Sequence, residues 1–211
     1  MELVSQEPQI TKKFYLTGGT PLAAFYLHHR LSVDIDLFTQ EQEVDPKLTD
    51  AFLKRVTPKL SIIHIDRSQF LGLVSYKLIY KNKKELKVDF NYYPFPRIEK
   101  GIKYKNLKVD SVYDIGINKI HTLFMKPRTR DYVDLYFIMN NYDYSLKKLI
   151  SDAKAKFDWH IDSVNLSSQF IKVKDIKDQD FPKMLKSFDR KKMEEFFISL
   201  AKSLERDIFK A

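Results

Sequence analysis

The sequence predicts an α+β fold, with a mixed β-sheet and flanking helices in the first half of the chain and a helical region in the second. Before residue 110, apolar and polar residues alternate in several short runs, which is the period of a half-buried strand. From Asp110 onward apolar residues recur at helical spacing. We therefore predict two domains in the 211 residues, an α/β core at 1–110 and a helical domain at 111–211.

The first predicted strand, residues 13–17, ends at Gly18-Gly19. Thr20 has the typical side chain of a helix N-cap, and Pro21 suits the first helical position because its missing N–H has no helical partner there. A short helix then ends near His28 and His29, which we expect to cap it or to lie exposed. The next predicted strand is 33–38.

The remaining elements follow from the same patterns. A hairpin is expected between 71–80 and 86–92, with its turn at Lys81–Lys84 and with Leu86, Val88 and Phe90 on one face. The other predicted strands are 60–65 and 103–109, and the predicted helices are 46–57, 112–125, 129–140, 145–157, 162–171 and 183–208.

The composition excludes several classes of protein. Because there is no cysteine, disulfides, thiolate zinc sites and a cysteine nucleophile are excluded. No run of apolar residues is long enough for a transmembrane helix, and the N-terminus lacks the pattern of a signal peptide. We expect a cytoplasmic protein with no membrane partner.

The net charge of +9 is concentrated in one segment. Residues 77–108 carry ten Lys and Arg side chains against three Asp and Glu, a net charge of +7, with tyrosines between them. This pattern is typical of nucleic-acid binding, through phosphate contacts and base stacking. It is equally typical of a lysine-rich sheet edge that prevents aggregation.

Three features carry candidate chemistry. Gly18-Gly19 before a helix lets the backbone approach a phosphate, although such a pair is often only a turn. Asp34 and Asp36 share one face of a strand, either as ligands of a divalent cation or as solvated acids. Asp89, on the polar face of the second hairpin arm, would be a third carboxylate.

In this order the features resemble the nucleotidyltransferases related to DNA polymerase β. The blocks Leu16–Ala23 and His29–Phe38, together with Lys119 and the segment Arg130–Tyr136, resemble the AbiEii/AbiGii toxin family more narrowly. The resemblance covers residues 13–140 and implies a polymerase β-like core.

The resemblance also implies roles for individual residues. Gly18, Gly19 and Thr20 would hold nucleotide phosphates, with Lys119 and Arg130 as further phosphate contacts. Asp34, Asp36 and Asp89 would bind Mg²⁺ or Mn²⁺. Lys119 and Asp131 would match an essential lysine and aspartate of the family. Read physically, Asp131 and Asp134 are also simple first-turn acids that complement a helix dipole.

The implied activity is transfer of a nucleoside monophosphate from an NTP to an acceptor hydroxyl. The resemblance implies the toxin of a toxin–antitoxin or abortive-infection system, a cognate antitoxin, and RNA, such as the tRNA 3′ end, as acceptor. Two alternatives remain open on the sequence. One is a nucleotidyltransferase that acts on a small molecule or a protein. The other is a non-catalytic nucleic-acid-binding protein, in which the three aspartates would lie too far apart to share ions.

Overall fold

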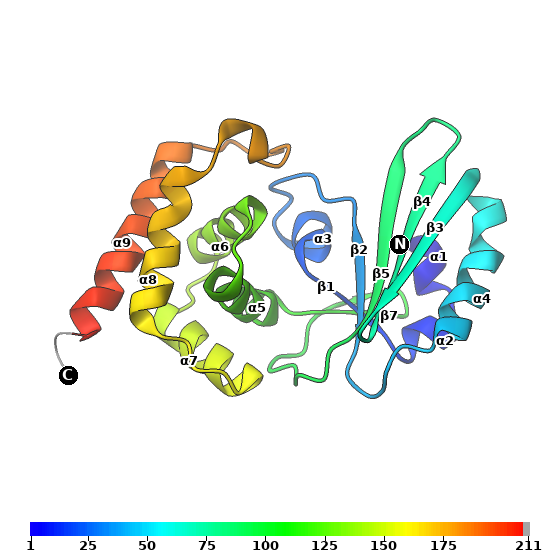
Figure 1. Ribbon diagram of the computed structural model, residues 1–211, viewed down its shortest axis with the longest axis horizontal. Coiled ribbons are helices and arrows are strands. Elements are labelled where there is room, and N and C mark those ends of the chain that lie inside the picture. Colours follow the sequence, from blue (N-terminus) through cyan, green and yellow to red (C-terminus); the bar gives the residue numbers. More distant parts are fainter. Residues whose placement is uncertain (209–211) are drawn as a thin grey trace. The chain divides into compact units, whose positions relative to one another are not determined.

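The computed structural model describes residues 1–208, in two compact units (Figure 1). The sheet unit comprises Met1–Pro21 and Ser32–Ser111. The helical unit comprises Leu22–Leu31 and the chain from Val112 onward. The chain thus leaves the sheet unit after Pro21 and returns to it at Ser32.

The sheet unit contains a seven-stranded mixed sheet in the order β3-β4-β5-β2-β1-β7-β6. Strand β2 is parallel to β5, and β1 is parallel to β7, while the other neighbours are antiparallel. The mixed sheet predicted from the sequence is thereby confirmed. The strands are β1 (Tyr15–Thr17), β2 (Ile35–Thr39), β3 (Ile62–Phe70), β4 (Leu73–Tyr80), β5 (Glu85–Tyr92), β6 (Lys103–Tyr104) and β7 (Leu107–Val109).

The two faces of this sheet differ because side chains alternate along each strand. On one face, Phe90 lies edge-on to Phe52 of helix α4 (Pro46–Val56), with ring centroids 6.2 Å apart. The short helices α1 (Glu2–Ser5) and α2 (Pro8–Thr11) lie on the same side as α4 (Figure 1). The opposite face, which we call the open face, carries Asp89 and its register partners.

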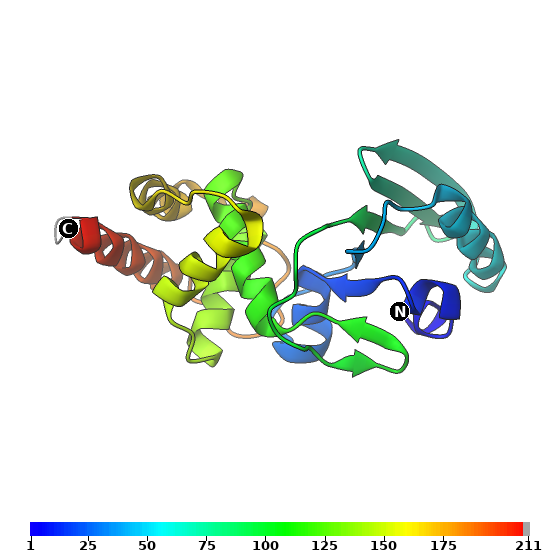
Figure 2. The same ribbon diagram turned by 90° about the horizontal axis from the view of Figure 1, so that it is seen from below.

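Several predicted elements of the sheet unit differ from the structure. The expected strand 103–109 is the hairpin β6–β7, in which Lys105 adopts a positive φ of 54° (Figure 2). Strand β3 extends to Phe70, and a tight turn at Leu71-Gly72 then leads into β4. The predicted hairpin is confirmed as β4 and β5, with Val88 and Phe90 buried on one face.

The helical unit begins with the π-helix η1 (Leu22–Tyr26). Its other helices are α5 (Val112–Met125), α6 (Thr129–Asn141), α7 (Leu146–Phe157), α8 (Ser163–Ile171) and α9 (Arg190–Ile208). Phe170 of α8 and Phe197 of α9 are fully buried, with ring centroids 5.4 Å apart. The predicted start of the last helix at 183 is wrong, because Met184 pairs with Arg30 in an isolated β-bridge. Among the described residues, no helix is both long and apolar enough to cross a membrane.

Candidate active site

Two aspartates lie side by side at the centre of the open face. Asp36 on β2 and Asp89 on β5 are direct register partners in a parallel pair. Neighbouring strands are about 4.8 Å apart, and paired residues point to the same face, so the two side chains are adjacent. This pairing joins residues that are far apart in the sequence.

The same register continues across the sheet with polar side chains. Thr17 of β1 pairs with Asp36, and Ser75 of β4 pairs with Asp89. Ser68 of β3 pairs in turn with Ser75. Five neighbouring strands therefore place a row of hydroxyl and carboxylate groups on one face, which is a set of oxygen donors.

Gly18 is required by the position of Asp36. Its φ is +83°, a backbone conformation that residues other than glycine rarely adopt. A Cβ atom on Gly18 would lie 3.0 Å from Oδ2 of Asp36. The glycine predicted to hold phosphate therefore also makes room for a carboxylate.

Thr20 is not a helix N-cap, since it lies inside the helical turn α3 (Gly19–Pro21). Its buried hydroxyl donates a hydrogen bond to the carbonyl oxygen of Asp34, and it lies 3.0 Å from the hydroxyl of Ser32. Thr20 thus fixes the segment that leads into β2. Asp34 directly precedes that strand, so only Asp36 of the two predicted strand aspartates belongs to it.

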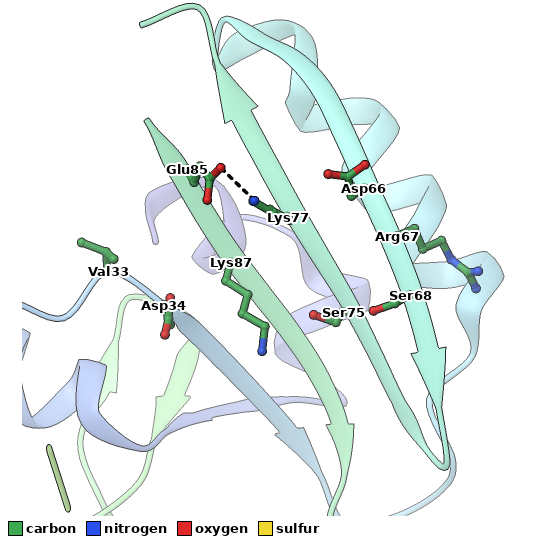
Figure 3. Close-up of a pocket in the computed structure, with 9 residues that line it drawn as sticks. All are labelled: Val33, Asp34, Asp66, Arg67, Ser68, Ser75, Lys77, Glu85 and Lys87. Atoms are coloured by element: carbon green, nitrogen blue, oxygen red, sulfur yellow. Dashed lines mark ion pairs between the residues drawn. The ribbon is translucent and has the colours of Figure 1, made fainter. Parts of the chain in front are cut away.

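A cleft of about 540 Å³ opens on this face of the sheet unit. Asp34, Lys87 and Ser75 line it (Figure 3). Lys77 of β4 and Glu85 of β5, on neighbouring strands, also line the cleft and form an ion pair of 2.8 Å. Arg67 also borders the cleft, but its guanidinium points away and binds Asp50 of α4 at 3.1 Å.

Asp89 is held by two neighbours on the open face. The ammonium of Lys87 lies 2.5 Å from Oδ2 of Asp89, and the hydroxyl of Ser75 donates to Oδ1 at 2.6 Å. Lys87 is half exposed, so another cation can replace its ammonium group at Asp89 while the ammonium stays hydrated.

We next ask whether the carboxylates of Asp34, Asp36 and Asp89 are arranged to bind a divalent cation. Within residues 1–208, no three His, Asp or Glu side chains are grouped as a metal site. The structure brings Asp36 and Asp89 together and leaves Asp34 at the edge of the cleft, so the predicted three-carboxylate cluster is not gathered. Two carboxylates still fit Mg²⁺, which takes one or two of them and completes its shell with waters and substrate phosphates.

The other predicted residues lie in the helical unit, in a buried charge cluster. Lys119 of α5 bridges Asp131 and Asp134 of α6, at 2.7 Å and 2.6 Å. Asp131 also accepts hydrogen bonds from the backbone N–H of Arg128 at 3.2 Å and from its Nε at 2.9 Å. Asp131 therefore caps α6 as well as pairing with Lys119. Arg130, in the first turn of α6, is half-buried.

Asp134 is the most heavily engaged member of this cluster. Arg30 binds both of its oxygens, at 2.7 Å and 2.9 Å, and Nε2 of His29 lies 2.9 Å from Oδ1. His29 is fully buried, so the expectation that it lies exposed is wrong, whereas the expectation is confirmed for His28, which is exposed. The sequence offered one signal for this contact, namely that His29 and Arg30 belong to the block that resembles the toxin family.

The cluster keeps its carboxyl groups ionised. Burial raises the pKa of Asp134, but Lys119, His29 and Arg30 outweigh it and hold the pKa far below the ordinary value. Burial likewise raises the pKa of Asp131, and Lys119 and Arg128 bring it below the ordinary value. Both groups are therefore anions in the folded protein.

Comparison with known proteins decides the family. The model of the family described as "Nucleotidyl transferase AbiEii toxin, Type IV TA system" matches residues 3–202. The chain belongs to the AbiEii family. The resemblance seen in the sequence is thereby confirmed and extends through the helical unit, and the protein is a nucleotidyltransferase.

Three matches illustrate what this AbiEii chain is similar to. An uncharacterized protein of Aquifex aeolicus is 29% identical over 158 residues, which cover 70% of this chain and 68% of the relative. The Helicobacter pylori protein JHP933 superposes with a TM-score of 0.60 at 17% identity, covering 99% of this chain and 89% of its own. A second H. pylori structure, described as a candidate nucleotidyltransferase, gives 0.60 at 18% identity, with 99% and 92% covered. These two structures share the fold.

Proposed function

We propose that this AbiEii protein transfers a nucleoside monophosphate from an NTP to a hydroxyl of RNA, with the tRNA 3′ end as acceptor, in a reaction that needs a divalent cation. The observation that carries the proposal is the register pair Asp36–Asp89 on the open face, with Gly18 against it. A pair of adjacent carboxylates beside a glycine turn is suited to hold a triphosphate through a cation.

Mg²⁺ or Mn²⁺ fits the oxygen donors of Asp36 and Asp89, with waters and substrate phosphates completing its shell. When bound, the cation supplies positive charge against the triphosphate. The backbone of Gly18 and Gly19 orients the phosphates, and Thr20 holds Asp34 in place through its hydrogen bond to the Asp34 carbonyl. Asp89 accepts the proton of the attacking hydroxyl, whose oxygen bonds to the α-phosphorus of the NTP as the bond to the β-phosphate breaks and pyrophosphate leaves.

The chain itself contributes mostly position and charge, which suffices for phosphoryl transfer because little covalent chemistry by the protein is required. The correspondence with the family supports Lys119, Asp131 and Arg130 as functional residues of the helical unit. For Lys119 the proposed contact is with phosphate oxygens, in addition to its ion pairs with Asp131 and Asp134.

The RNA acceptor is supported by the distribution of charge. The basic segment 77–108 is not one hairpin surface, because it is divided between β4–β5 and the β6–β7 hairpin at the other edge of the sheet. Lys77 is neutralised by Glu85, and Lys105 by Glu2. The remaining cations still give a nucleic acid positive surface on both sides of β2. The family description further supports a role as a toxin with a cognate antitoxin.

The test is incubation of the protein with each labelled NTP, Mg²⁺ and total RNA. We expect label in RNA with the wild type and none with Asp36→Ala. Asp158→Asn is the matched control, because this exposed residue has a positive φ of 46° that asparagine adopts readily. Label on protein or on a small molecule in place of RNA contradicts the proposed acceptor.

A further inference from the structure

We propose that the sheet unit carries a binding site for the phosphate backbone of a single-stranded nucleic acid, formed by Arg97, Lys103 and Lys108 beside Tyr15. The inference rests on the proposed function, because this site would hold the acceptor strand while its end is at Asp36 and Asp89. It lies on the β1–β7–β6 side of the sheet, away from the cleft over β3–β5.

The strand register places the cations in one row. Lys103 of β6 and Lys108 of β7 are direct antiparallel partners, and Lys108 is the parallel partner of Tyr15 on β1. The β6–β7 hairpin and the neighbouring β1 are visible in Figure 2. Since register partners point to the same face, Lys103, Lys108 and Tyr15 share one face of three neighbouring strands.

Arg97 adds a third cation to this row. Its guanidinium carbon lies 4.6 Å from the centroid of the Tyr15 ring, a cation–π contact. Its Nε is buried and has no hydrogen-bond partner. Tyr15 thus orients the Arg97 side chain, while the Nε–H group of Arg97 has no hydrogen-bond acceptor in the described part of the protein. Leaving a buried donor without an acceptor costs free energy, which a bound ligand can offset.

Among the described residues, the three cations have no direct carboxylate partner, although Glu41 lines a separate small cavity with Arg97 and Lys108. Like charges directly opposite each other on paired strands are destabilising. Within the part of the chain that the structure describes, no carboxylate forms an ion pair with Arg97, Lys103 or Lys108. Lys105, in the turn of the same hairpin, is by contrast paired with Glu2. An anion would relieve the repulsion between the three cations.

The cations line a cavity that is bordered by a closely packed loop. Arg97, Lys103 and Lys108 line a cavity of about 280 Å³ together with Lys100 and Gly101. A Cβ atom on Gly101 would lie 2.0 Å from the carbonyl oxygen of Val109, so the loop is packed directly on the backbone of β7. This close packing fixes the loop that carries the cations.

Aromatic rings continue the basic row across the open face, next to the register row that holds the carboxylates. Phe38 is the register partner of Tyr15, as Asp36 is of Thr17, so Tyr15, Phe38 and Asp36 lie on the open face. Two residues along a strand span about 6.8 Å. The ring centroid of Phe38 is 4.7 Å from that of Tyr93, which is 4.9 Å from that of Phe95. All three side chains are half-buried.

This order of groups identifies the class of ligand. A basic row binds phosphates, and the partly exposed rings beside that row stack with bases, the combination that binds single strands. An acidic peptide would use the cations and leave the rings without a partner. The geometry therefore favours a single-stranded nucleic acid, with its backbone on Arg97, Lys103 and Lys108 and its terminal bases on Phe38 and Tyr93.

The test measures binding of a short, fluorescently labelled single-stranded RNA by anisotropy, without NTP, over a range of salt concentrations. The variant is the double substitution Lys103→Gln with Lys108→Gln, and both side chains are exposed, so the fold is retained. We expect Kd to rise about tenfold or more. The slope of log K against log salt should fall by about 1.4, since each lost phosphate contact on a single strand removes about 0.7.

Lys105→Gln is the control in the same hairpin; it removes one positive charge where the double variant removes two, from a lysine already paired with Glu2, and we expect Kd within about twofold of the wild type. RNA binding by the double variant equal to that of the wild type overturns the inference. Displacement of RNA by polyglutamate as readily as by unlabelled RNA also overturns it, in favour of an acidic protein partner. Failure of the proposed function is separate, because it appears as the absence of labelled RNA from the wild-type transfer assay.

Discussion

Two pairs of aspartates in this protein have opposite surroundings. Asp131 and Asp134 are fully buried, and Lys119, the cation between them, is only 7% exposed. Asp36 and Asp89 lie half-buried on a sheet face, and Lys87, the cation on Asp89, is 50% exposed. A buried, satisfied pair stabilises a fold, whereas a pair whose counter-charge is exchangeable is suited to bind a cation and substrate. Residue type alone therefore does not distinguish an aspartate pair that stabilises the fold from one that is suited to bind a cation.

The comparison predicts its largest effect at Asp36. Asp36→Asn should lower nucleotidyl transfer by about 100-fold or more, because it removes a charged cation ligand next to the reacting phosphate. The free energy of unfolding of the helical unit should not change. Transfer activity is measured with labelled NTP and RNA, and unfolding by urea with the fluorescence of Trp159, the one tryptophan of the chain. A variant that retains activity would contradict the role of Asp36.

At the buried pair the effect should fall on stability. Asp134→Asn leaves Arg30 buried with a neutral partner and Lys119 with Asp131 as its one remaining anion among the described residues, and breaking a buried ion pair in this way costs about 3–5 kcal/mol. The measurement is the urea midpoint of the helical unit, again by Trp159 fluorescence. Asp36→Asn serves as the comparison, and an equal loss of stability in both variants would remove the distinction between the two pairs.

Acid should act on the same buried pair. Because the pKa of Asp134 and of Asp131 is below the ordinary value of 3.8 in the folded state, their stabilisation is complete above that pH. It is lost as the pH falls below about 3.8, by up to about 1.4 kcal/mol per pH unit for each group. Unfolding free energies of the wild type measured from pH 5 downward should decline over this range. In Asp134→Asn the decline should be shallower, and an equal slope would contradict the assignment.

The smallest expected effect concerns Lys87. A charge about 4 Å away in water contributes about 1 kcal/mol, so Lys87→Gln should lower the Mg²⁺ concentration for half-maximal transfer by about fivefold. Lys77→Gln is the control, since the Lys77 ammonium is paired with Glu85. A higher requirement for Mg²⁺ in the Lys87 variant would show that Lys87 assists the reaction instead of competing with the cation.

Local pattern predicted much of this fold. The alternation Leu86, Val88, Phe90 placed Asp89 on the correct face, and the helical period from Asp110 identified α5 to α8. The pairing of β2 with β5 could not be predicted, because it depends on strand order and not on neighbours in sequence. The ion pair of Arg30 with Asp134 could not be predicted either, because the two residues are 104 positions apart and a contact at that separation produces no local pattern in the sequence. The β6–β7 turn was missed because Lys105 is an unusual residue for a positive φ.

The placement of Leu22–Leu31 in the helical unit has a consequence for synthesis of the protein. His29 and Arg30 leave the ribosome about a hundred residues before Asp134, their partner. The helical unit therefore cannot complete its charged core from the C-terminal half of the chain alone. A fragment that starts at Val112 lacks the two cations of Asp134, so cutting the gene between the two halves should not yield two independent folding modules. Contacts over such a long stretch of chain are formed late and slowly.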